Sequence, residues 1–98
     1  MSLFRLGTVV TTDGIRQRIE NQLGFAAFVE SALTRHSSGD WGDICDDDKK
    51  MNDEAIEAEK NGEPTDRLFS SYECGIDKVW IITEYDRSVT TVLLPEEY

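Results

Sequence analysis

Residues 78–94 read KVWIITEYDRSVTTVLL. β-branched and aromatic residues fill both halves of this stretch, and the polar tripeptide Asp86-Arg87-Ser88 is the only break between them, which is typical of a β-hairpin. A four-residue loop of residues 85–88 would place Glu84 opposite Val89. Counting outward from that pair predicts the pairs Thr83–Thr90, Ile82–Thr91, Ile81–Val92, Trp80–Leu93 and Val79–Leu94.

Both faces of this hairpin carry apolar residues, so we expect it inside a sheet, with one face under helices and the other partly exposed. Hydrophobic spacing upstream predicts a strand, three helices and another strand. An apolar stripe of Ile15, Ile19 and Leu23, ended by Gly24, marks the first helix. The predicted ranges are a strand at 4–12, helices at 15–23, 25–36 and 46–60, and a strand at 67–74. The sequence therefore predicts an α+β fold, β-α-α-α-β-β-β, with a four-stranded, mostly antiparallel sheet and helices packed on one face.

Size and charge exclude several classes of protein. Ninety-eight residues form a single domain, residues 1–98, with room for one core. Twenty acidic and ten basic residues give a net charge of −10, which argues against direct binding to nucleic acid or to an anionic membrane. The chain shows neither a signal peptide nor an apolar run of about 20 residues. We therefore expect a cytoplasmic protein with Cys45 and Cys74 reduced.

The acidic charge is concentrated in one segment. Residues 40–66 hold eleven acidic residues and three lysines, a local charge of −8. On the predicted helix these acids could bind a basic protein partner, or they could be a solvated face that serves solubility. Imitation of DNA by this helix alone is excluded, because seven acids and three lysines along about 22 Å are too dilute. The residues proposed for the acidic binding face are Asp46, Asp47, Asp48, Glu54 and Glu57.

A second candidate is a polar site built from the segment after the second helix and from the hairpin tip. Its members are His36, Asp40, Trp41, Asp43 and Arg87. The spacing of His36, Asp40, Asp43 and Cys45 fits no metal motif, so neither a metal nor another cofactor is expected. His36 also continues the apolar stripe of its helix, and Trp41 is a large apolar side chain in a tight loop. We therefore expect Trp41 to be buried, which would make the loop structural first.

Three blocks of this sequence, residues 35–43, 67–72 and 79–98, resemble the small bacterial "plasmid-related" proteins. Some members of that family are labelled type I restriction endonuclease subunit M, but the Gly-rich loop and Asn-Pro-Pro-Tyr type motif of an adenine methyltransferase do not occur here. The resemblance implies an origin on a mobile element and no established activity. It also implies that the Gly39–Asp43 loop and the hairpin tip belong together, so that Asp40 or Asp43 could pair with Arg87.

The leading hypothesis is a non-enzymatic interaction protein that uses its acidic face to bind a basic protein, such as a nucleic-acid-handling or defence protein of the host. The alternative is a small enzyme or ligand-binding domain with a polar site around His36, Asp40, Asp43 and Arg87. A third option is a symmetric homodimer formed through the exposed face of the hairpin.

Overall fold

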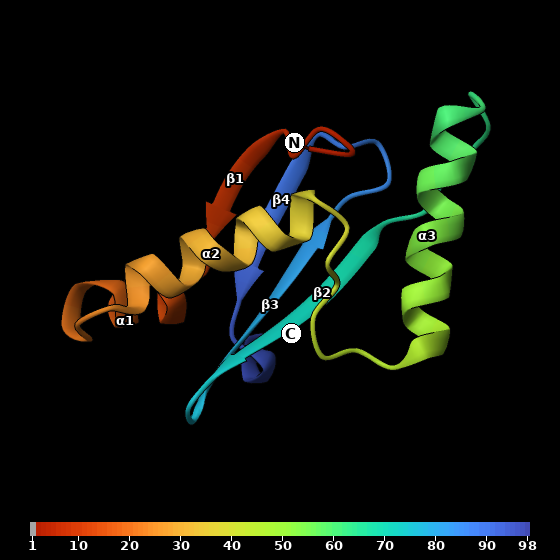
Figure 1. Ribbon diagram of the computed structural model, residues 1–98. Helices are drawn as coiled ribbons and strands as arrows, with labels where there is room; N and C mark the ends of the chain where they lie inside the picture. Colours follow the sequence, from red (N-terminus) through yellow and green to blue (C-terminus); the bar gives the residue numbers. More distant parts are fainter. Residues whose placement is uncertain (1) are drawn as a thin grey trace.

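The predicted hairpin forms the centre of the sheet in the computed structural model, which describes residues 2–98 (Figure 1). Strands β3 (Asp77–Thr83) and β4 (Val89–Leu93) pair antiparallel. The Glu84 N–H donates to the carbonyl of Val89 over 2.9 Å, so the loop has the predicted length. The register is also confirmed, with Trp80 opposite Leu93, Ile81 opposite Val92, Ile82 opposite Thr91 and Thr83 opposite Thr90.

The other two strands form the edges of the sheet. Strand β2 (Leu68–Cys74) runs antiparallel to β3 and completes the meander, and β1 (Thr8–Thr11) lies parallel to β4. The strand order is β1-β4-β3-β2. The predicted α+β fold with a four-stranded, mostly antiparallel sheet is confirmed.

Helices α1 (Asp13–Asn21) and α2 (Phe25–Ser37) lie across one face of this sheet (Figure 1). Alternation along β3 turns Val79 and Ile81 toward them, and both side chains are fully buried. Each apolar side chain of that size stabilises the fold by roughly 1.5–3 kcal/mol when it leaves water. The buried cluster comprises Ile15, Phe25, Val29, Ala32, Tyr72, Val79, Ile81, Val92 and Leu94.

Helix α3 (Asp46–Lys60) has the predicted bounds and stands beside the β2 edge (Figure 1). Three aspartates in its first turn and Lys60 in its last complement the helix dipole. Its Ala55 and Ile56 join a second core cluster with Phe4, Trp41, Ile44 and Leu68. No helix within residues 2–98 is long and apolar enough to cross a membrane.

Two predicted elements near the N-terminus have the wrong bounds. The first strand does not span residues 4–12, because Gly7 has a left-handed φ of +67° and bends the chain before β1. The first helix ends at Asn21, where Gln22 turns to extended backbone, and Leu23 is fully exposed instead of completing the stripe. The spacing of four placed Leu23 on the helix, but the helix ends two residues before it.

Candidate functional site

Trp41 is part of the second core and not of the surface. Its side chain is 3% exposed, its ring stacks on Phe4 with centroids 6.1 Å apart, and its Nε1 donates to the Asp53 carboxylate over 2.9 Å. The next residue, Gly42, bridges to Ser71 with a φ of +76°, and a Cβ there would lie 1.9 Å from the Ser71 carbonyl oxygen. Only glycine fits this position. The predicted burial of Trp41 is confirmed, and its loop closes one side of β2.

Asp40 and Asp43 do not meet Arg87. The Asp40 carboxylate accepts from Nε and Nη2 of Arg35 at 2.8 and 3.2 Å, and this pairing lowers the pKa of Asp40. The Asp43 side chain is exposed, while its backbone N–H donates to the carbonyl of Ser71 over 2.7 Å. The expected pair between Asp40 or Asp43 and Arg87 is wrong. Asp40 binds Arg35 on the adjoining helix, and Arg87 binds Glu59.

His36 is fully buried at the start of a chain of hydroxyl groups that crosses the sheet. Its Nδ1 lies 2.5 Å from the hydroxyl of Ser70, and its Nε2 lies 2.9 Å from that of Thr83. Thr83 in turn lies 2.8 Å from the hydroxyl of Thr90, which donates to the Leu6 carbonyl over 2.7 Å. Because Thr90 has a single proton to donate, Thr83 donates to Thr90 and accepts from Nε2–H. Ser70 must then donate to Nδ1.

The imidazole of His36 is neutral in this buried site. Burial, reinforced by the positive charge of Arg87, lowers the pKa of His36 to about 3. Both ring nitrogens already have partners inside the protein, so neither is free for a metal or for proton transfer with a ligand. His36 is therefore a structural residue of the core in this arrangement.

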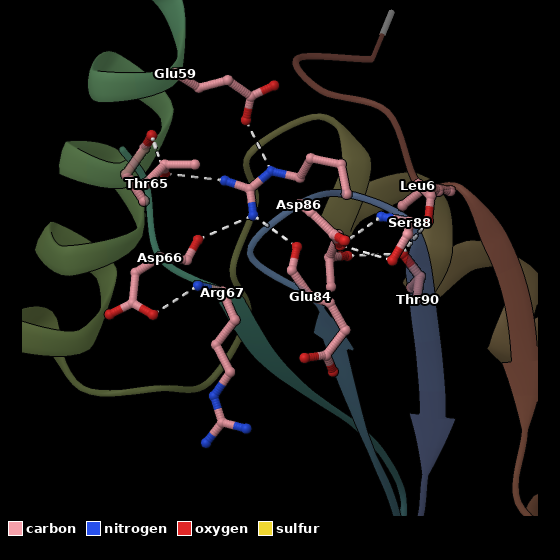
Figure 2. A network of polar contacts seen from close by, with 12 residues as sticks. Leu6, Glu59, Thr65, Asp66, Arg67, Glu84, Asp86, Ser88 and Thr90 are labelled. Atoms are coloured by element: carbon pink, nitrogen blue, oxygen red, sulfur yellow. Dashed lines mark hydrogen bonds and ion pairs between the residues drawn. The ribbon is translucent and has the colours of Figure 1, made fainter. Parts of the chain in front are cut away.

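Arg87 is held by the end of α3 and the segment after it. Figure 2 shows three of the residues that bind it, Glu59, Thr65 and Asp66. The Arg87 side chain is 6% exposed, and its Nε donates to the Glu59 carboxylate over 2.7 Å. The remaining nitrogens donate to the carbonyls of Asp66 and Glu84 at 2.9 and 3.0 Å and to the hydroxyl of Thr65 at 3.2 Å. The φ of Arg87 is +59°, a left-handed conformation that costs about 1 kcal/mol or more outside glycine. Arg87 thus fastens the hairpin tip to α3 and is not presented to a partner.

A groove of about 670 Å³ lies between α3 and the face of the sheet opposite α1 and α2. Its floor is formed by Phe69, Trp80 and Ile82, which alternate with the core residues of β2 and β3. The rings of Phe69 and Trp80 meet edge to face at 90° with centroids 5.1 Å apart, and Tyr98 adds a third ring 5.5 Å from Trp80. Together the three rings form an aromatic surface, and Tyr98 is 68% exposed.

The rim of this groove is acidic. Asp48, Glu54 and Asp66 line it together with one cation, Arg67. The Arg67 guanidinium lies 5.9 Å from the centre of the Tyr98 ring and donates to the Tyr98 hydroxyl over 2.7 Å. An aromatic face attracts a cation through its quadrupole. The Tyr98 side of the groove therefore already holds a cationic side chain of the protein, Arg67.

The acidic face predicted from the sequence is divided by the structure. All five carboxylates are exposed on α3, and no ion pair within residues 2–98 includes any of them. Asp48 and Glu54 line the groove, whereas the other three, Asp46, Asp47 and Glu57, do not. Two of the five residues therefore border an apolar surface that a partner could enter.

The aromatic floor itself was not predicted as a site. The alternation of the hairpin places Trp80 and Ile82 on one face, and that pattern was the available signal. No pattern among neighbouring residues predicts that Phe69 and Tyr98 lie beside Trp80. Strand β2 and Tyr98 come together there only through folding.

Within residues 2–98, His, Cys, Asp and Glu side chains do not gather in groups of three that could hold a metal ion. His36, Trp41 and Arg87 instead converge on Phe4, whose ring contacts all three. Comparison with known proteins found no matching family model, no matching curated protein and no matching solved structure.

Proposed function

We propose that this protein is a non-enzymatic interaction domain that binds a basic protein segment in the groove between α3 and the sheet. The observation that carries the proposal is the combination of an aromatic floor with an acidic rim. An apolar side chain of the partner would lie against Phe69 and Trp80, and flanking lysines or arginines would lie near Asp48, Glu54 and Asp66.

Charge supports a basic occupant over a neutral or acidic one. The net charge is −10, so the field of the whole molecule attracts cations before contact and repels nucleic acid and other acidic chains. Complementary charge of this kind raises association rates and selects partners, while buried aromatic contacts usually supply most of the affinity.

The polar site of His36, Asp40, Asp43 and Arg87 supports a catalytic role less well. The nitrogens of His36 and Arg87 are used within the protein, and Asp40 is paired with Arg35. The unpaired thiols of Cys45 and Cys74 favour a cytoplasmic setting. The mobile-element origin suggested by the plasmid-related resemblance stays a prediction, and so does a host defence or nucleic-acid-handling protein as the partner.

Selection from a random peptide library against the immobilised protein tests the proposal. We expect enriched peptides to combine lysine or arginine with a large apolar residue. Titration calorimetry with a selected peptide should give an affinity that falls as salt is raised, because salt screens the charges on the rim.

Matched variants separate the groove from the general field of the molecule. Asp48→Asn with Glu54→Gln removes two carboxylates from the rim, and Asp46→Asn with Glu57→Gln removes two from elsewhere on the same helix. We expect the rim pair to weaken peptide binding about fivefold, the scale of exposed ion pairs, and the control pair to weaken it much less. Equal losses from both pairs, or selected peptides without basic residues, would rule out the groove as the site.

A further inference from the structure

The β1 edge of the sheet has one side of its backbone unpaired. The strand order ends at β1, and the N–H groups of Thr8 and Thr12 donate toward β4 over 2.9 and 3.1 Å. Alternation along a strand then turns the N–H and C=O groups of Val9 and Thr11 away from the sheet. No other element of residues 2–98 bonds to these groups. Val9 and Thr11 thus each offer one N–H donor and one C=O acceptor, which is the pattern that an added strand requires.

The side chains of β1 leave this edge open to pairing. All four residues are exposed, with Val9 at 42% and Val10 at 41%. The strand TVVT is short but entirely β-branched, and it contains none of the charges, prolines or bulges that also protect an edge. The exposed edge therefore offers its backbone groups to an added strand.

The distribution of charge indicates which occupant fits this edge. Residues 1–39 carry four arginines and three acids, a net charge of +1, whereas residues 40–66 carry −8. Helix α3, which holds much of that charge, stands beside the opposite edge of the sheet (Figure 1). Two copies of a chain with a net charge of −10 repel each other least when they meet at β1, because that contact keeps their acidic segments far apart.

We propose that β1 is the surface through which a second copy of this chain binds, by antiparallel strand addition about a two-fold axis. An axis beside Val10 places Val9 of each copy opposite Thr11 of the other, and each such pair exchanges two backbone hydrogen bonds. Val10 faces its own counterpart in a non-hydrogen-bonded pair, where side chains approach most closely. The two sheets join into one of eight strands, and the acidic grooves stay free at its two ends.

This surface differs from the exposed hairpin face that the sequence suggested for a dimer. Ile82 and Leu93 on that face are already 6% and 5% exposed within one chain. The neighbouring aromatic rings border the acidic groove, so two copies meeting there would bring their acidic rims together.

Sedimentation velocity on the full chain with charge-swap variants at Val10 tests the inference. The wild-type protein should dimerise as its concentration rises from micromolar to millimolar. Val10→Lys and Val10→Glu each place like charges opposite one another at the axis, so each variant alone should sediment as a monomer. An equimolar mixture of the two should form a heterodimer, because the opposed charges then attract.

The mixture also shows that both variants are folded, since unfolded chains could not restore association. Asn61→Lys, at the exposed end of α3, adds the same charge far from β1 and should leave the dimer intact. Added salt should strengthen self-association by screening the repulsion between copies, opposite in sign to its effect on a basic peptide in the groove. A wild-type monomer at millimolar concentration, or variants that dimerise like the wild type, would overturn the inference.

Discussion

The two edges of the sheet differ in whether their outward backbone groups are hydrogen-bonded within residues 2–98. At β2, the Asn52 carboxamide donates to the Phe69 carbonyl over 2.6 Å and accepts from the Phe69 N–H over 3.3 Å, as a neighbouring strand would. The Gly42 loop bridges to Ser71 just beyond. At β1, the outward backbone of Val9 meets no such group within residues 2–98.

This difference shows that closing an edge requires particular residues in particular places. Asn52 is 4% exposed, so a buried amide has been placed where its two hydrogen-bonding groups match one residue of β2. Gly42 is needed because any side chain would collide with Ser71. Where the chain supplies no such residues, as at β1, the backbone groups stay available to water or to another strand.

The largest effect is expected when the loop that covers the β2 edge loses its buried tryptophan, Trp41. Trp41→Ala empties a buried site between Phe4 and His36, and should lower the free energy of unfolding by about 3–5 kcal/mol. Urea denaturation followed by circular dichroism measures this change. Trp41→Phe, which keeps most of the apolar contact, should lose clearly less. An unfolding midpoint close to that of the wild type for Trp41→Ala would mean that the loop does not depend on the tryptophan.

A smaller loss is expected when the closed edge is opened directly. Asn52→Ala leaves the N–H and C=O of Phe69 without their partners, and should lower the free energy of unfolding by about 2–3 kcal/mol. Hydrogen exchange should show the amide of Phe69 losing its protection while the amides of β3 keep theirs. Lys50→Ala, at an exposed position on the same helix, is the matched control. Unchanged protection of the Phe69 amide in Asn52→Ala would contradict the proposed cap.

The third effect concerns the polar chain that links the two edges, from Ser70 on β2 through His36 to the carbonyl of Leu6 before β1. The pKa of His36 is about 3 in the folded protein and about 6.5 in the unfolded chain, so below pH 6.5 unfolding takes up a proton. The free energy of unfolding should therefore fall as the pH is lowered, by up to about 1.4 kcal/mol per pH unit. At pH 5 it should be about 2 kcal/mol lower than at neutral pH.

His36 is the single histidine of the chain, and most carboxylates titrate below pH 5, so the window between pH 7 and 5 isolates its contribution. Denaturation curves across that window should slope for the wild type and be nearly flat for His36→Gln. Equal slopes in the two proteins would show that burial does not keep the ring of His36 neutral.

The sequence predicted the features that depend on neighbours along the chain. The register of the hairpin follows from loop length and from alternation over adjacent residues, and the bounds of α3 follow from acids at its start and Lys60 near its end. The burial of Trp41 was also predictable, because so large an apolar side chain is seldom exposed without a reason. The hairpin register and the bounds of α3 are each decided within about fifteen residues, whereas Phe4, on which Trp41 stacks, lies 37 residues away in the sequence.

Tertiary structure alone decided which distant groups meet. Arg87 was assigned to Asp40 or Asp43, yet it binds Glu59, because the packing of α3 beside β2 brings that carboxylate to the hairpin tip. The groove combines β2, β3, α3 and Tyr98, and Asn52 closes β2 across 17 residues of sequence. Such contacts depend on how whole elements pack, and a local pattern of apolar and polar residues specifies which face of an element is buried but not which element covers it.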